Sequence, residues 1–287
     1  MQLLPALPEE TIFSRCVRTR EVYGMTAEQF FSVFFNKKTH SVHPYLNTSL
    51  NILSEKTTET GHELWNRQTL LPLYAWAMPE YRERLADLAN TAMNLYNICN
   101  LSTYAEGHPA LIKHCPVCIH HDVRNYGVGY WHRQHQIAGV TSCNHHQVRL
   151  NTIHYPRLSG ITRHMLLHQV QRITLSSEEN FCFAKFSSEI LEFICNSNPE
   201  FISHIHSPVI RRYRKQVQSK ERTSVFELAL YMELSKIVEK IDHSSKNLFP
   251  TKKNTFSYWR SLLFSRSPQS PTRYLLLLYC LKKLEPS

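Results

Sequence analysis

Long hydrophobic runs are missing from this chain of 287 residues. The longest aliphatic run covers only residues 275–278, far below the ~20 residues that a membrane-spanning helix needs. The opening stretch MQLLPALPEETIFSRC lacks the basic segment followed by an apolar one that marks an export signal. The sequence therefore predicts a soluble, unexported protein that has no membrane partner.

Glycine and acidic residues are also scarce. The chain has 7 glycines, and its 23 Asp and Glu are outnumbered by 33 Lys and Arg, which gives a net charge of +10. Hydrophobic residues at 42% are enough to bury a core, which excludes a disordered or collagen-like chain. At about 150 residues per domain, the length predicts roughly two domains.

Signature motifs of common enzymes are absent as well. The sequence contains no G-x-S-x-G, Walker A, H-E-x-x-H or zinc-deaminase pattern. Glu63 beside His62 and Asp122 beside His121 are available carboxylates, but adjacency in sequence rarely makes a catalytic pair. A protein that is not an enzyme is the favoured interpretation, with a zinc-dependent enzyme as a minor alternative.

The excess positive charge lies entirely near the C-terminus. Residues 201–287 hold 16 Lys and Arg against 6 Asp and Glu, whereas residues 1–200 hold 17 of each. Basic residues interleaved with aromatic ones are typical of surfaces that follow a nucleic-acid backbone, and a merely solvated basic face is the alternative. The predicted nucleic-acid contacts are Arg211, Arg212, Arg214, Lys215, Lys252, Lys253, Arg260 and Arg273.

The N-terminal third predicts helices. Apolar positions in residues 9–23 recur at helical spacing, Gly24 breaks the run, and the sequence from Thr26 to Gln29 forms a capping box for a second helix ending at Phe35. This is a helix, a tight turn and a helix. Residues 81–99 predict one further helix, while residues 70–74 are too short and too broken by Pro72 to assign.

The middle of the chain changes character, because residues 106–155 hold nine of the 17 histidines and three cysteines. Helical patterns return afterwards, at residues 187–195, 224–241 and 258–264, with an apolar stripe of Val225, Leu228, Ala229 and Met232 in the second of these. The predicted fold is mainly α: a helix-turn-helix domain over 1–105, a zinc-binding module over 106–158 and a basic helical domain over 159–287.

Two ligand pairs point to a metal. Cys115 and Cys118 form a C-x2-C pair, and Cys143 and His146 form a C-x2-H pair, which is the local spacing that presents four donors to one tetrahedral zinc. The 24 residues between the pairs exceed the loop of a classical finger, so they must hold a small structure of their own. Four protein ligands close the coordination sphere, which favours a structural zinc over a catalytic one.

The fourth ligand is open at this stage. His145 can replace His146 geometrically, and a second or alternative ligand can come from His120, His121, His132 or His135. The other cysteines lack paired spacing and are expected to be small buried hydrophobic residues; they are Cys16, Cys99, Cys182, Cys195 and Cys280.

The residues around the ligand pairs resemble the TniQ/TnsD family of transposon target-selection proteins. The resemblance covers residues 3–150 and rests on LPEE and SR near the N-terminus, TLLPLY at 69–74, CPxC, YW-x-R-x-HQ and C-x-x-H. The last pair departs from the usual Cys-Pro-x-His-Gly context, because it reads CNHHQ.

The resemblance implies a helix-turn-helix domain, a zinc finger, a helical C-terminal domain and no catalytic activity. It implies an adaptor that links target DNA or a guide-RNA (Cascade-type) effector complex to the AAA+ regulator TnsC and the transposase, in the bacterial cytoplasm at the nucleoid. The length favours this shorter TniQ type, and a TnsD-type direct reader of attachment-site DNA is the alternative. A homodimer and a longer parent protein remain open.

Overall fold

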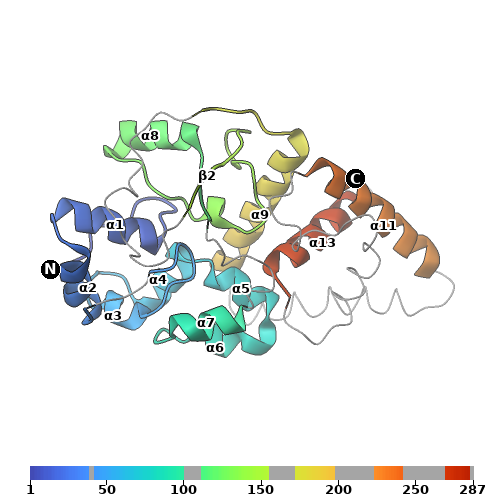
Figure 1. Cartoon of the computed structure of the whole chain (residues 1–287). Helices are drawn as coiled ribbons and strands as arrows, with labels where there is room; N and C mark the ends of the chain where they lie inside the picture. Colours follow the sequence, from blue (N-terminus) through green and yellow to red (C-terminus); the bar gives the residue numbers. More distant parts are fainter. Residues whose placement is uncertain (39–41, 100–110, 155–171, 198–222, 242–268, 285–287) are drawn as a thin grey trace.

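A computed structural model describes residues 1–38, 42–99, 111–154, 172–197, 223–241 and 269–284 (Figure 1). The predicted mainly helical fold is confirmed in these ranges. The first helices are α1 (Ile12–Val22), α2 (Ala27–Phe35), α3 (Leu50–Ser54), α4 (Gly61–Gln68), α5 (Leu71–Ala77), η1 (Pro79–Tyr81), α6 (Arg82–Ala86) and α7 (Ala92–Ile98). The later elements are β1 (Leu111–His114), α8 (Pro116–Tyr126), η2 (Gln134–Gln136), β2 (Asn151–His154), α9 (Glu178–Asn196), α11 (Thr223–Lys240) and α13 (Pro271–Leu284).

The helix, turn and helix at the N-terminus form as predicted. Thr26 caps α2 through the expected capping box, since its side chain accepts from the backbone N–H of Gln29 and the Gln29 side chain accepts from the N–H of Thr26. Gly24 adopts a φ of +62° in the turn, a conformation that costs glycine little. The phenylalanines of α2 enter the core, and Phe30 stacks on Phe34 with 4.6 Å between ring centroids.

Helix α5 is the centre of the packing. All seven of its residues are buried, and it contacts α4, α6, α9 and α13. Pro72 lies in the first turn of α5, where its missing N–H has no intrahelical partner to lose. Pro72 is therefore compatible with a helix in the segment that the sequence left unassigned. Because α5 has neighbours on all sides, it is apolar on every face.

The predicted single helix over residues 81–99 is wrong, because it divides into α6 and α7. Asp87 ends α6 in an extended conformation and accepts from the N–H of Ala89 through its side chain. Thr91 then caps α7 by accepting from the N–H of Asn94. Side-chain hydrogen bonds to nearby backbone compete with the helix here, although the apolar spacing alone suits a continuous one.

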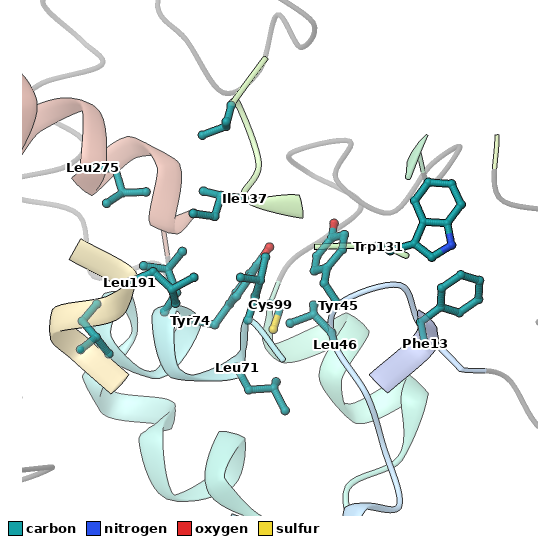
Figure 2. Close-up of a cluster of buried hydrophobic side chains, with 14 of the residues drawn as sticks. Phe13, Tyr45, Leu46, Leu71, Tyr74, Cys99, Trp131, Ile137, Leu191 and Leu275 are labelled. Carbon is teal, nitrogen blue, oxygen red and sulfur yellow. The ribbon is translucent and has the colours of Figure 1, made fainter. Parts of the chain in front are cut away.

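The C-terminal helices complete one side of the core. Helix α13 packs against α5, α9 and α11, and Leu275 and Leu276 are fully buried (Figure 1). Figure 2 draws part of the core, to which α1, α5, α9 and α13 contribute Phe13, Tyr74, Leu191 and Leu275. The helix expected at residues 258–264 lies outside the described residues.

Helix α11 has the predicted extent but turns a different face inward. Its buried residues are Leu230, Leu234 and Ile237, whereas Met232 of the predicted stripe is 51% exposed. The helix expected at 187–195 is also longer, since it begins at Glu178 behind the N-cap Ser177. Leu230, Leu234 and Ile237 recur at spacings of four and three residues, so they form an apolar stripe of their own on α11, which packs against α13.

Two substitutions in α11 test which face is buried. Leu234→Ala should lower the free energy of unfolding by about 2–5 kcal/mol, because it opens a cavity beside α13. Met232→Ala should change it by less than about 0.5 kcal/mol, because this side chain faces solvent. Chemical denaturation of both variants measures the difference, and equal losses would contradict the packing of α11.

Candidate metal centre

The two ligand pairs come from two local structures. Cys115 is the N-cap of α8 and Cys118 lies in its first turn, so both thiols gather at a helix N-terminus, where the helix dipole favours thiolates. Cys143 and His146 lie in a tight hairpin closed by the hydrogen bond from Cys143 N to Val148 O, at 2.8 Å. Gln147 takes a φ of +50° to make this turn.

The four predicted ligands meet at one point. Their donor atoms all lie within 4.8 Å of one another. The Nδ1 atom of His146 is 3.7 Å from Cys115 Sγ, 3.3 Å from Cys118 Sγ and 3.5 Å from Cys143 Sγ. The two sulfurs of Cys118 and Cys143 are 3.7 Å apart.

These separations fit a tetrahedral zinc ion. Zinc bonds of about 2.3 Å to sulfur and about 2.05 Å to nitrogen place neighbouring sulfurs about 3.8 Å apart and sulfur and nitrogen about 3.6 Å apart. The four distances given above differ from these values by a few tenths of an ångström at most. A Cys3His donor set is also one that zinc commonly takes in closed structural sites.

The geometry favours His146 over its neighbour His145 as the fourth donor. His146 turns its ring into the cluster, whereas the His145 ring is exposed and its Nε2 lies 3.1 Å from the Asn144 side chain. His145 contributes its backbone instead, by donating its N–H to Cys143 Sγ at 3.4 Å. Such a bond to a thiolate sulfur is typical of a zinc knuckle.

Of the four histidines considered as alternative ligands, His135 and His121 contact the cluster. His135 is buried, its Nε2 lies 3.9 Å from Cys118 Sγ, and burial lowers its pKa well below the usual value. His132 bonds to Asp122 at 2.8 Å, and the ring of His121 packs on that of His146. His120 is exposed on α8. These contacts position the ligands and belong to the layer outside them.

Hydrogen bonds within the cluster act on its thiols. Bonds from Cys118 and Cys143 lower the pKa of the Cys115 thiol, which favours one thiolate at the centre. Among the other cysteines, Cys16, Cys99 and Cys280 are buried as predicted, while Cys182 and Cys195 are half-buried. Burial raises the pKa of Cys16 to about 12, so this thiol is inert.

The expected interval structure and carboxylates are also in place. Most of α8 and all of η2 lie between the two ligand pairs. The Gln136 side chain joins η2 to β1, since it accepts from Lys113 N and donates to Lys113 O. Glu63 caps α4 by accepting from the N–H of Thr60, so this carboxylate has a helix-capping role beside His62.

The structure describes one of the predicted nucleic-acid contacts. Arg273 lies half-buried on α13, where its guanidinium donates to Gln269 Oε1 at 2.8 Å. The other residues of that prediction lie outside the described ranges: Arg211, Arg212, Arg214, Lys215, Lys252, Lys253 and Arg260. Their role stays a prediction.

Sequence reasoning missed the contacts that fix the metal module to the N-terminus. Trp131 O accepts from Thr11 N at 3.0 Å, Arg133 N donates to Glu9 O at 2.7 Å, and a single β-bridge pairs Glu10 with His132. The Arg133 guanidinium donates hydrogen bonds of 3.0–3.2 Å to the Glu9 carboxylate. The residues that make these contacts belong to the LPEE and YW-x-R motifs. Neither motif shows by itself that the two segments are in contact.

A pair of histidine substitutions tests the ligand assignment. His146→Ala should lose zinc, because it removes a ligand and leaves three thiols to share the ion. His145→Ala should keep one zinc per chain, because its ring lies outside the cluster. Metal content after dialysis against a weak chelator measures both; zinc kept by His146→Ala and lost by His145→Ala would reverse the assignment.

Comparison with known proteins agrees with the motifs. The family model named TniQ matches residues 3–150, just over half of the chain. A search of curated proteins gives no match. The match contains all four clustered ligands and both sides of the contact between Glu9 and Arg133. The chain therefore belongs to the TniQ family, whose role is target selection in DNA transposition.

Proposed function

We propose that this protein is an adaptor that links a target-recognition module to the AAA+ regulator TnsC and the transposase. The observation that carries the proposal is the use of basic side chains in the described N-terminal part. In a direct DNA reader these side chains should lie open toward phosphates. In helix α1 they are paired instead with acidic residues of the chain.

The arginines of α1 show this use most clearly. Arg15 is 2% exposed and pairs with Glu59 at 2.6 Å. Arg18 donates to Glu10 at 2.8 Å, and Arg20 pairs with Glu21 at 2.6 Å. These guanidiniums stabilise the fold, and their charge is balanced before any nucleic acid approaches.

If α1 and α2 form a helix-turn-helix, α2 is its recognition helix. Its sequence, AEQFFSVFF, contains no Lys or Arg, and its first turn carries Glu28. Its phenylalanines are committed to the core. A helix that reads base edges generally presents Arg, Lys, Asn or Gln to the major groove. The composition of α2 supports contact with protein rather than direct reading by this helix.

Three of the described C-terminal lysines also have acidic neighbours. Lys283 pairs with Glu179 at 2.5 Å, and Lys282 reaches Glu189 at 4.0 Å. Lys236 lies 3.5 Å from Glu233. These surface pairs are weak, but they spread the basic charge of α11 and α13 among acidic groups instead of concentrating it.

Zinc has a structural role in this proposal. Cys115, Cys118, Cys143 and His146 would hold it, and the ion supplies folding free energy to the module when bound. The module then serves to fix the segment around Trp131 against α1.

Direct reading of attachment-site DNA is the second candidate, and one observation favours it. Residues 201–287 hold 16 basic and 6 acidic residues, and most of this segment lies outside the described ranges. This charge suits target DNA or a guide-RNA effector complex equally. A homodimer and association with the nucleoid belong to the same proposal. Among the described residues no helix is long and apolar enough to cross a membrane.

Salt-dependent DNA binding separates the two candidates. The adaptor should bind duplex DNA weakly, with equal affinity for unrelated sequences, and should bind TnsC without DNA. Replacing Arg211, Arg212, Arg214 and Lys215 by Gln should flatten the salt dependence of the DNA affinity, because fewer counterions are released. Fluorescence anisotropy measures the affinity, with Lys236→Gln as the control from an ion-paired position.

The opposite outcome is equally clear. A direct reader should distinguish its site by about 1–3 kcal/mol for each correct base pair. Discrimination of that size by the isolated chain, without measurable binding of TnsC, would contradict the adaptor proposal.

A further inference from the structure

A cavity of about 370 Å³ lies between α4, α5 and the end of α9. This volume falls in the range of sites that bind small ligands or single large side chains. Its walls are mainly apolar and include Trp65, Pro72, Ala75, Trp76 and Ile194. It lies apart from the four clustered ligands, none of which lines it.

Polar groups in the walls are already engaged. The indole N–H of Trp65 donates to Leu85 O at 2.9 Å, and the Asn66 side chain donates to Cys195 O at 2.7 Å. These bonds fix the walls without a ligand. What they leave for an occupant is apolar surface, including the face of a half-buried tryptophan.

The cavity is lined by two arginines, Arg67 and Arg82, and by one carboxylate, Glu63, which lies one turn before Arg67 on α4 and attracts it electrostatically. Arg67 is exposed at the end of α4, and within the described part of the chain no hydrogen bond or ion pair involves its guanidinium. This distinguishes it from the arginines of α1. Arg82 lines the same cavity, as does Glu63, whose carboxylate accepts from the N–H of Thr60 in the α4 cap.

We propose that this cavity, the Trp65 pocket, receives a large apolar side chain from an acidic segment of a partner protein, whose neighbouring carboxylate pairs with Arg67. Tryptophan and arginine dominate binding energy at protein interfaces, where a buried anchor is surrounded by polar contacts. A planar guanidinium at the rim suits a carboxylate, which it binds in a bidentate manner. The inference goes beyond the adaptor role, since it depends on neither TnsC nor DNA.

The charge at the rim favours a peptide over a nucleic acid. Glu63 stays ionised, because its hydrogen bonds to Thr60 lower its pKa. A phosphate backbone carries a charge at every nucleotide and has to pass this carboxylate. A peptide can place one acidic residue at Arg67 and a neutral one at Glu63. Single-stranded DNA is therefore the outcome that the test has to separate.

The experiment selects peptides on the zinc-loaded full chain from a random 12-residue phage library. Selected peptides should carry Trp, Phe or Leu beside Asp or Glu. A fluorescein-labelled synthetic copy of the most enriched peptide should then lose at least tenfold in affinity with Arg67→Glu. Arg124→Glu, an exposed position on α8 that does not line the cavity, should change the affinity less than twofold.

A second variant tests the apolar part separately. Ala75→Leu places extra carbon in the cavity and should also weaken the peptide at least tenfold, provided that its thermal melting matches that of the wild type. Selection of peptides without acidic residues, or equal affinity for the wild type and Arg67→Glu, overturns the proposal. Displacement of the peptide by a 12-nucleotide oligo(dT) whose binding depends on Arg67 assigns the cavity to single-stranded DNA and also overturns it.

Discussion

Three buried thiols and one imidazole share a space less than 5 Å across, and the rest of the N-terminal half depends on what holds them there. Thiolates at this distance repel one another unless a cation lies between them. A zinc ion bound there would remove the repulsion and join α8 to the hairpin that carries His146. It would thereby link two short elements into one module.

Arg133 connects the metal module to the rest of the N-terminal half. The guanidinium contacts the Glu9 carboxylate, the backbone oxygen of Asn66 on α4 and, at 3.5 Å, the Cys195 sulfur on α9. A side chain that is 4% exposed thus ties together segments from three parts of the chain. Cys195 and Asn66 also line the Trp65 pocket, so the same contacts that fix the metal module hold one wall of the proposed docking site.

The sequence predicted correctly those features of the fold and the site that depend on residues close together in the chain. The capping box at Thr26 and the ligand spacing from Cys115 to His146 both follow from short-range patterns. Long-range packing decided the rest: α13 selects Leu234 over Met232 as the inner face of α11, and the core makes a helix around Pro72. No local pattern could show that Glu9 meets Arg133 across 124 residues.

The environment of the bound metal tests the account most directly. X-ray absorption of the zinc-loaded full chain should give three sulfur neighbours at about 2.3 Å and one nitrogen at about 2.0–2.1 Å, with no water in the first shell. That result would support a closed site whose function is to hold the fold. A bound water, or only two sulfurs, would contradict the account, because the ion would then have an open position and the module a different basis for its order.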